Sequence, residues 1–222
     1  MRFLHLAAFF SMILAATPGI ACTPVAGYRI PTNVELVQRA DLIVLARVVA
    51  GPPASAPIGV PWSDPPKVIL DPVEVLKGEL PKEIPRLFGV TFARNGPIRA
   101  TVTPLTNAHP SAYAGGCVRN EYAVGTLVVA MFKRTPDGLK QLDFPFARQA
   151  EDVAAPSDTW VRAVRFYVNA SRGAAGEQRQ RFQLLKDSLA RDGDGKDREI
   201  SKDIGRYLAT DPQNAGRSAE MW

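Results

Sequence analysis

Two cysteines constrain this chain more than any other feature of its sequence. Cys117 lies in a stretch, 115–132, that joins a Gly-Gly turn to a long apolar run, and its only possible partner is Cys22. A bond between the two would fasten the start of the chain to the middle of a β-rich domain. In the chain-entropy model, closing a loop of this size stabilises a fold by roughly 4–5 kcal/mol.

The first 21 residues have the parts of a signal peptide. Arg2 gives a positive start, an apolar segment spans 3–16, and Gly19 and Ala21 are the small residues that a signal peptidase recognises. We expect cleavage after Ala21 and a mature chain that begins at Cys22, secreted or in the periplasm. The apolar segment is too short to span a bilayer, so stable membrane insertion is not expected. In an oxidising compartment, two cysteines favour a disulfide bond over a metal or redox site.

The alternative is a lipoprotein with lipid on the sulfur of Cys22. Position 19 is glycine, however, where a lipobox usually has a branched apolar residue. Lipidation would also leave Cys117 with no cysteine to pair with. The disulfide interpretation is therefore preferred.

Length and charge limit the possible function classes. The chain has 222 residues and a formal charge of +5, and its length suits one domain with an appendage or two small domains. The basic residues are scattered and form no dense run. Mild, scattered basicity in an exported protein favours solubility over nucleic-acid binding. We therefore expect no nucleic-acid partner.

Residues 22–150 have the patterning of a β domain. A short helix is expected from Pro31-Thr32-Asn33, and strands are expected over 42–49, 67–78, 86–93, 98–103, 126–134 and 139–146. Asn95-Gly96 is a strong hairpin turn between the third and fourth of these strands. Pro72 implies a bulge or an edge in the second. Five or six short strands suit a small closed barrel, so the predicted fold class is mainly β, with helices.

After Pro156 the apolar spacing changes from two residues to 3.6. Three amphipathic helices are expected, one capped by Ser157, one over 177–190 and one over 197–209, and the last two could form an antiparallel pair. The acidic segment 192–197 resembles a calcium loop but lacks its turn glycine, so we interpret it as a connector. The expected organisation is a signal peptide over 1–21, a barrel over 22–150, a helical appendage over 151–211 and a loose tail over 212–222.

Histidine is scarce, which limits the catalytic options. Loss of His5 with the signal peptide leaves His109 as the only histidine, in a polar loop before Pro110, where an exposed side chain is expected. A multi-histidine zinc site is thereby excluded. A hydrolase would depend on His109 or Glu121. We expect no enzyme activity, no cofactor and no metal site of the chain's own.

Arg119 and Glu121 follow Cys117 on a strand-like segment, two residues apart, so their side chains share one face. A surface ion pair is the simpler interpretation, and a ligand-binding arginine is the alternative. The aromatic residues of the expected strands favour core packing over a base-stacking surface. They are Phe88, Phe92, Phe132, Phe144 and Phe146.

Cleavage after Ala21 would give Cys22 a free α-amino group beside its own carbonyl. These two groups can chelate a metal in a five-membered ring. A disulfide to Cys117 would hold them rigidly, which lowers the ordering cost of binding. Thr23 would then be the first side chain beyond the metal. The alternative is that Cys22 only ties down the terminus.

Four local matches resemble the netrin-like domain, best known from tissue inhibitors of metalloproteinases. They are the start Cys22-Thr23, the run 40–49, the run 73–78 that ends in Lys-Gly, and Cys117 followed by the apolar run 127–130. The resemblance implies a five-stranded barrel of the oligonucleotide/oligosaccharide-binding (OB) type over about 22–146. It also implies that Cys22 would bind a protease's catalytic zinc, with Thr23 entering the adjoining pocket.

The chain departs from this family in ways that bear on function. Pro24 stands where the family usually has a second cysteine, the other family disulfides are missing, and the C-terminal helices do not resemble the inhibitors' second domain. We therefore predict an exported, non-enzymatic protein that binds another protein, with Cys22, Thr23, Arg119 and Glu121 as candidate contact residues. Metalloprotease inhibition and a structural scaffold in the envelope are the two alternatives.

Overall fold

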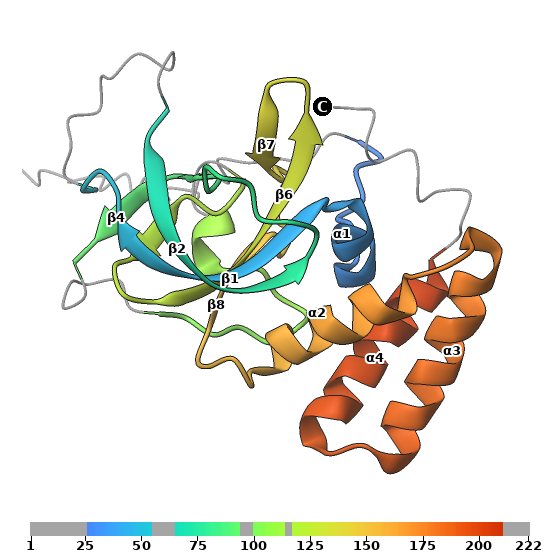
Figure 1. Ribbon diagram of the computed structural model, residues 1–222. Coiled ribbons are helices and arrows are strands. Elements are labelled where there is room, and N and C mark those ends of the chain that lie inside the picture. Colours follow the sequence, from blue (N-terminus) through green and yellow to red (C-terminus); the bar gives the residue numbers. More distant parts are fainter. Residues whose placement is uncertain (1–25, 55–64, 94–99, 114–116, 211–222) are drawn as a thin grey trace, which may run out of the picture.

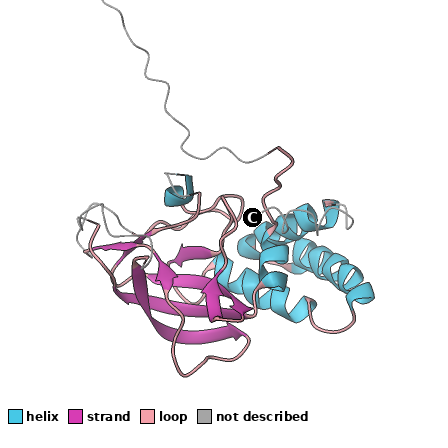
Figure 2. Ribbon diagram, turned by 90° about the horizontal axis from the view of Figure 1, so that it is seen from above, coloured by secondary structure: helices cyan, strands magenta, loops and turns pink. Residues whose placement is uncertain are grey.

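The computed structural model describes residues 26–54, 65–93, 100–113 and 117–210. In this part of the chain, an antiparallel sheet of six strands is followed by three C-terminal helices, which lie together on one side of the sheet (Figures 1 and 2). This confirms the predicted order of strands followed by helices. The predicted signal peptide, Cys22, Thr23 and the tail over 212–222 lie outside the described residues.

Helix α1 (Asn33–Arg39) begins where the sequence predicts. Thr32 caps it, and Glu35 returns the bond by accepting from the Thr32 backbone nitrogen at 2.7 Å, which completes a capping box. The Arg29 guanidinium binds both carboxylate oxygens of Glu35, at 2.6 and 2.8 Å. These contacts fix the segment that enters the helix.

Strand β1 (Leu42–Ala50) is the centre of the sheet. It pairs antiparallel with β2 (Lys67–Lys77) on one side and with β6 (Leu127–Thr135) on the other. Its first residues are buried on both faces, because the helices cover one face and the curved sheet encloses the other. Opposite β1, the register of β2 shifts between Glu74 and Pro72, which confirms the predicted bulge.

The remaining strands leave the sheet open. Strand β3 (Leu87–Phe88) pairs with the start of β2, while β7 (Gly138–Gln141) and β8 (Ala150–Val153) pair with successive parts of β6. A separate parallel pair joins β4 (Val90–Phe92) to β5 (Glu121–Ala123). Where β3 and β7 approach each other, the Phe88 backbone nitrogen donates to the Gln141 side chain at 2.9 Å. The ladder of the described strands therefore does not close into a barrel.

One predicted strand, over 98–103, is absent from its described part, and one strand was missed. Residues 100–103 form no strand, because side chains of β8 take up their polar groups: the Thr101 nitrogen donates to Asp152 at 2.8 Å and the Thr103 hydroxyl to Glu151 at 3.1 Å. The turn Asn95-Gly96 lies outside the described residues. Strand β8 itself was missed, because two of its four residues are acidic and the alternation of an ordinary strand is absent.

The helices follow the predicted faces with small changes at their ends. Helix α2 (Thr159–Ala170) is capped by Asp158 rather than by Ser157. Helices α3 (Ala175–Asp192) and α4 (Gly195–Ala209) pack side by side as an antiparallel pair, as expected (Figure 1). In the connector between them, Asp194 and Asp197 form the capping box of α4.

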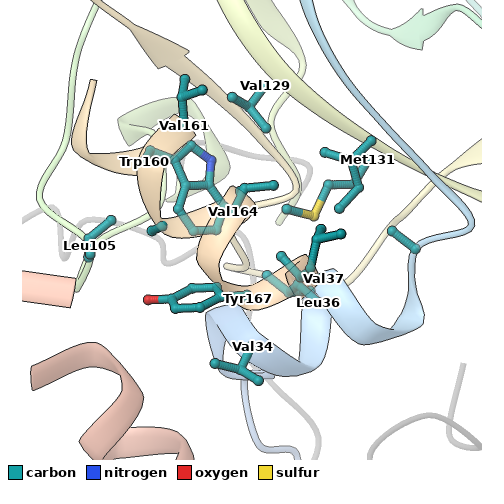
Figure 3. Packing of buried hydrophobic residues seen from close by; sticks show 14 of the residues in the cluster. Val34, Leu36, Val37, Leu105, Val129, Met131, Trp160, Val161, Val164 and Tyr167 are labelled. Carbon is teal, nitrogen blue, oxygen red and sulfur yellow. The ribbon is translucent and has the colours of Figure 1, made fainter. Parts of the chain in front are cut away.

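Helices and sheet share one hydrophobic core. Residues from α2 lie at its centre, between α1 and β6 (Figure 3). The labelled members are Val34, Leu36 and Val37 from α1, Val129 and Met131 from β6, Trp160, Val161, Val164 and Tyr167 from α2, and Leu105 from the loop before β5. Helices α3 and α4 add Phe182, Leu189, Ile200 and Ile204. A second cluster fills the other face of the sheet.

Two leucines of α3 test whether the helices and the sheet fold as one unit. Leu189 is buried in the shared core, whereas the side chain of Leu184 is 64% exposed. We expect Leu189→Ala to lower the free energy of unfolding by about 2–5 kcal/mol. The matched Leu184→Ala variant should stay within about 0.5 kcal/mol of the parent. Urea unfolding followed by circular dichroism and by tryptophan fluorescence measures both, and separate transitions for the two probes would contradict a shared core.

Candidate functional site

Two backbone positions that are far apart in sequence but adjacent in space are strained. Cys117 and Phe146 are the non-glycine residues with positive φ in the described part of the chain, at 58° and 59°. They are joined by a hydrogen bond of 2.7 Å from the Phe146 nitrogen to the Cys117 carbonyl. Such conformations cost about 1–3 kcal/mol each, persist only where the surroundings enforce them, and cluster at functional sites. This pair therefore marks the first candidate site.

Aromatic side chains surround the strained pair. Tyr113 is 51% exposed, and its ring stacks on Phe146 with centroids 5.6 Å apart. The Tyr28 hydroxyl donates to the Pro145 carbonyl at 2.8 Å, so the first described residues reach the same place. Burial raises the pKa of Tyr28 to about 12, which keeps this hydroxyl a donor at neutral pH. We call Tyr28, Tyr113, Cys117 and Phe146 the Cys117 surface.

A groove of about 1070 Å³ lies beside the Cys117 surface, between β3 and β7. Val118 and Asp143 line it, and Ile84 and Leu139 give it an apolar part. Its five basic residues outnumber its three acidic ones, so its formal charge is +2. They are Lys67, Lys82, Arg86, Arg134 and Lys140 against Glu83, Asp137 and Asp143.

Arg119 is buried, so the predicted surface ion pair with Glu121 is wrong. Its side chain is 1% exposed and binds Asp152 of β8 with 2.6 Å between Nη2 and Oδ1. Its Nε donates to the backbone carbonyl of Glu121 at 3.1 Å, and Nη1 donates to that of Ala150 at 3.2 Å. Glu121 itself is half-buried at the start of β5. Arg119 thus ties the segment after Cys117 to β8.

A second buried group ties the loop 101–113 to the same strand. Glu151 accepts from the His109 nitrogen at 3.0 Å and from the Thr103 hydroxyl at 3.1 Å. Arg148, 3.7 Å from Glu151, donates to Thr103 and to the carbonyls of Pro104 and Asn107. Burial raises the pKa of Glu151, and the nearby guanidinium groups oppose this. Both segments that carry the Cys117 surface are therefore anchored on β8.

His109 is also buried, contrary to the expected exposed side chain. It is 3% exposed, and its Nδ1 accepts from the Ser111 nitrogen at 3.2 Å and lies 2.8 Å from the Ser111 hydroxyl. Its Nε2 faces Asp152 at 3.6 Å. Burial lowers the pKa of His109 to about 4, and Arg119 acts in the same direction. Serine, histidine and aspartate lie side by side here, and all three side chains are buried.

Sequence reasoning missed Arg148, Glu151 and Asp152, which organise this site. The one available signal was a basic and two acidic residues within five positions, between the apolar residues Ala147 and Val153. Charged residues in such surroundings are buried only when they are paired. The segment could therefore have been recognised as a paired, buried strand.

Cys22 and Thr23 lie outside the described residues, so the Cys22–Cys117 pairing stays a prediction. Within the ranges that the structure describes, no cluster of three or more histidine, cysteine, aspartate or glutamate side chains could hold a metal ion. The same ranges contain no helix with the length and hydropathy needed to cross a membrane. Comparisons with protein-family models, curated proteins and solved structures gave no match. The resemblance to netrin-like domains likewise stays a prediction.

Two arginines test whether the buried ion pair holds the site. Arg119→Met leaves the Asp152 carboxylate buried without its cation, so we expect the free energy of unfolding to fall by about 3–5 kcal/mol. Arg134 is exposed in the groove, and Arg134→Met should change stability little. The double variant Arg119→Met/Asp152→Leu should recover part of the loss, because no buried charge is left unpaired. Urea unfolding checks all three, and equal effects at positions 119 and 134 would contradict the assignment.

Proposed function

We propose that this protein is an exported, non-enzymatic binding protein that recognises another protein through the Cys117 surface. The observation that carries the proposal is the strained Cys117–Phe146 pair with the exposed ring of Tyr113 stacked on it. Aromatic side chains are enriched at the centres of protein interfaces, because they bury a large area at a small entropic cost. The neighbouring groove adds a basic border, which favours a partner with acidic groups.

The start of the mature chain belongs to this surface in our proposal. Tyr28 is bonded to Pro145, next to Phe146, which in turn is bonded to Cys117. Tyr28 lies six positions after Cys22, and an extended chain of that length reaches about 20 Å. The contacts of Tyr28 therefore support a disulfide between Cys22 and Cys117, with Thr23 beside the exposed aromatic rings.

We further propose that the fold behind this surface is a netrin-like barrel of the OB type with an open seam. Three features support it. Strand β1 has antiparallel neighbours on both sides, β4 and β5 pair in parallel, and the free edges of β3 and β7 meet at Phe88 and Gln141. The segment from Cys22 to Phe146 would form this barrel, and the helices would pack on its outer face.

The more specific form of the proposal is metalloprotease inhibition. In it, the α-amine and carbonyl of Cys22 bind the catalytic zinc of an exported protease, and Thr23 enters the adjoining pocket. The bond from Tyr28 to Pro145 supports this form, because it holds a residue six positions after Cys22 at the Cys117 surface. The metal would belong to the partner and not to this chain.

Photo-crosslinking tests the general proposal. With a benzophenone side chain at position 113, we expect one defined adduct with an exported protein. The same group at position 184, exposed on α3, should give none. Unlabelled parent protein should abolish the adduct, and Tyr113→Ala should compete at least tenfold less well, since it lacks the stacked ring. An adduct from position 184 alone would indicate a scaffold that binds through its helices and would contradict the proposal.

An N-terminal extension tests the specific form. Mature protein and a version with one extra residue before Cys22 would be assayed against a panel of zinc endopeptidases. We expect inhibition by the mature protein and a loss of at least tenfold with the extension, because the extra peptide bond removes the chelating amine. Equal inhibition by both, or by neither, would contradict zinc chelation and leave the general binding proposal to the crosslinking result.

A further inference from the structure

The loop that carries Tyr113 is held by one group of buried side chains. At Leu105, the backbone nitrogen donates to Glu199 of α4 and the carbonyl accepts from Asn33. Beyond Leu105, the side chains that bind the loop lie in β8 and just before it. The nitrogen of His109 donates to Glu151, and Arg148 donates to the Asn107 carbonyl. The short 3₁₀ helix Pro110–Tyr113 follows and brings Tyr113 onto Phe146.

The protonation state of His109 follows from these contacts. A backbone N–H, that of Ser111, points at Nδ1, so Nδ1 must be the unprotonated ring nitrogen. The ring proton is then on Nε2, which faces Asp152. Charging the ring requires a second proton at Nδ1, where the Ser111 N–H already points. A proton taken up at Nδ1 therefore breaks the bond from the Ser111 N–H, and the Ser111 hydroxyl, 2.8 Å from Nδ1, is the acceptor that remains for it in the closed loop.

The surrounding charges add a second barrier. While Glu151 is ionised, Arg119 and Arg148 balance Asp152 and Glu151, so the buried group is neutral as long as His109 is neutral. A charged His109 would add one uncompensated positive charge beside Arg119. The remaining charged contact of the loop, Glu199 of α4, binds at Leu105. The open loop, in contrast, exposes the imidazole to water, where it ionises normally.

We propose that His109 is a proton-sensitive switch, in which uptake of one proton at Nδ1 breaks the His109–Ser111 turn and releases Tyr113 from Phe146. The switch regulates the surface assigned above, so its functional meaning rests on the proposed function. An exported protein meets the pH of its surroundings directly. Acidification would then remove the stacked ring from the Cys117 surface.

The sign and size of the effect follow from linkage. Burial depresses the pKa of His109 from its ordinary 6.5 to about 4, so the closed loop is favoured above pH 6.5. Between pH 6.5 and pH 4 the equilibrium for opening rises by up to about tenfold per pH unit, as for one proton taken up on opening. Glu151 acts in the opposite sense, because burial raises its pKa and its proton favours the closed state. A comparison of variants that all keep Glu151 therefore isolates the contribution of His109 to the pH dependence of opening.

Hydrogen exchange on the mature protein measures the opening. The amides of Ser111 and Ala112 would be followed from pH 7 to pH 4, with exchange corrected for its intrinsic pH dependence and with amides of β6 as an internal control for global unfolding. His109→Asn keeps an acceptor where Nδ1 lies but cannot be charged. Ser111→Ala keeps the backbone N–H and serves as the matched control.

We expect the protection factors of the parent and of Ser111→Ala to fall as the pH is lowered. This fall should exceed that of His109→Asn by up to about tenfold per pH unit. The same pH dependence in parent and His109→Asn would overturn the proposal. Nuclear magnetic resonance of the His109 ring in the parent gives an independent readout that needs no variant. A neutral ring with its proton on Nε2 down to about pH 4 is expected. Ordinary titration near pH 6.5, with the Ser111 amide still protected, would refute it.

Crosslinking from position 113 at pH 7 and at pH 4.5 separates this inference from the proposed function. A pH-dependent exchange with no adduct at either pH would leave the switch intact and refute the binding role. An adduct of equal yield at both pH values, despite loop opening, would refute the regulation and leave the binding role intact.

Discussion

The ion pairs that Asp152 and Glu151 of β8 make with arginines are the interactions on which the Cys117 surface depends. Asp152 binds Arg119 and the nitrogen of Thr101, and Glu151 binds the loop through Thr103 and His109. Removing carboxylates and guanidinium groups from water is costly, so they are stable here only because each is paired with a group of opposite charge. That requirement fixes two loops that have little secondary structure of their own.

Most of the regular elements could be predicted from the sequence, because their signals are local. The cap formed by Thr32 and Glu35 predicts α1, and the apolar run after Asp41 predicts β1. Helical spacing places Phe182 and Leu189 on the apolar face of α3. The pairing of the strands could not be predicted. Alternation indicates which face of a segment is buried, but not which segment lies beside it. The sequence predicts a hairpin that starts with residues 86–93, whereas β4 pairs in parallel with a strand 31 positions later.

The candidate site was less predictable, because its chemistry is long-range. Arg119 was assigned to Glu121 on their spacing of two residues, but its carboxylate partner is 33 positions away. His109 was assigned to solvent because its neighbours in sequence are polar, and no local pattern records that β8 covers it. The sequence predicts a strand-like segment at Cys117, whereas β5 begins only at Glu121 and Cys117 has a positive φ. The matching strain at Phe146 has no signal in the sequence, since phenylalanine rarely adopts positive φ.

The seam between β3 and β7 has a mechanical consequence for the whole sheet. Backbone ladders resist shear because many bonds must break together, whereas this seam is bridged by the side chain of Gln141. A single amide bond of this kind contributes about 1 kcal/mol. The seam is held by this bond and by the second hydrophobic cluster, which includes Leu87 of β3 and is contacted by Leu139 of β7. A change in side-chain packing there would widen the seam while every strand keeps its neighbours.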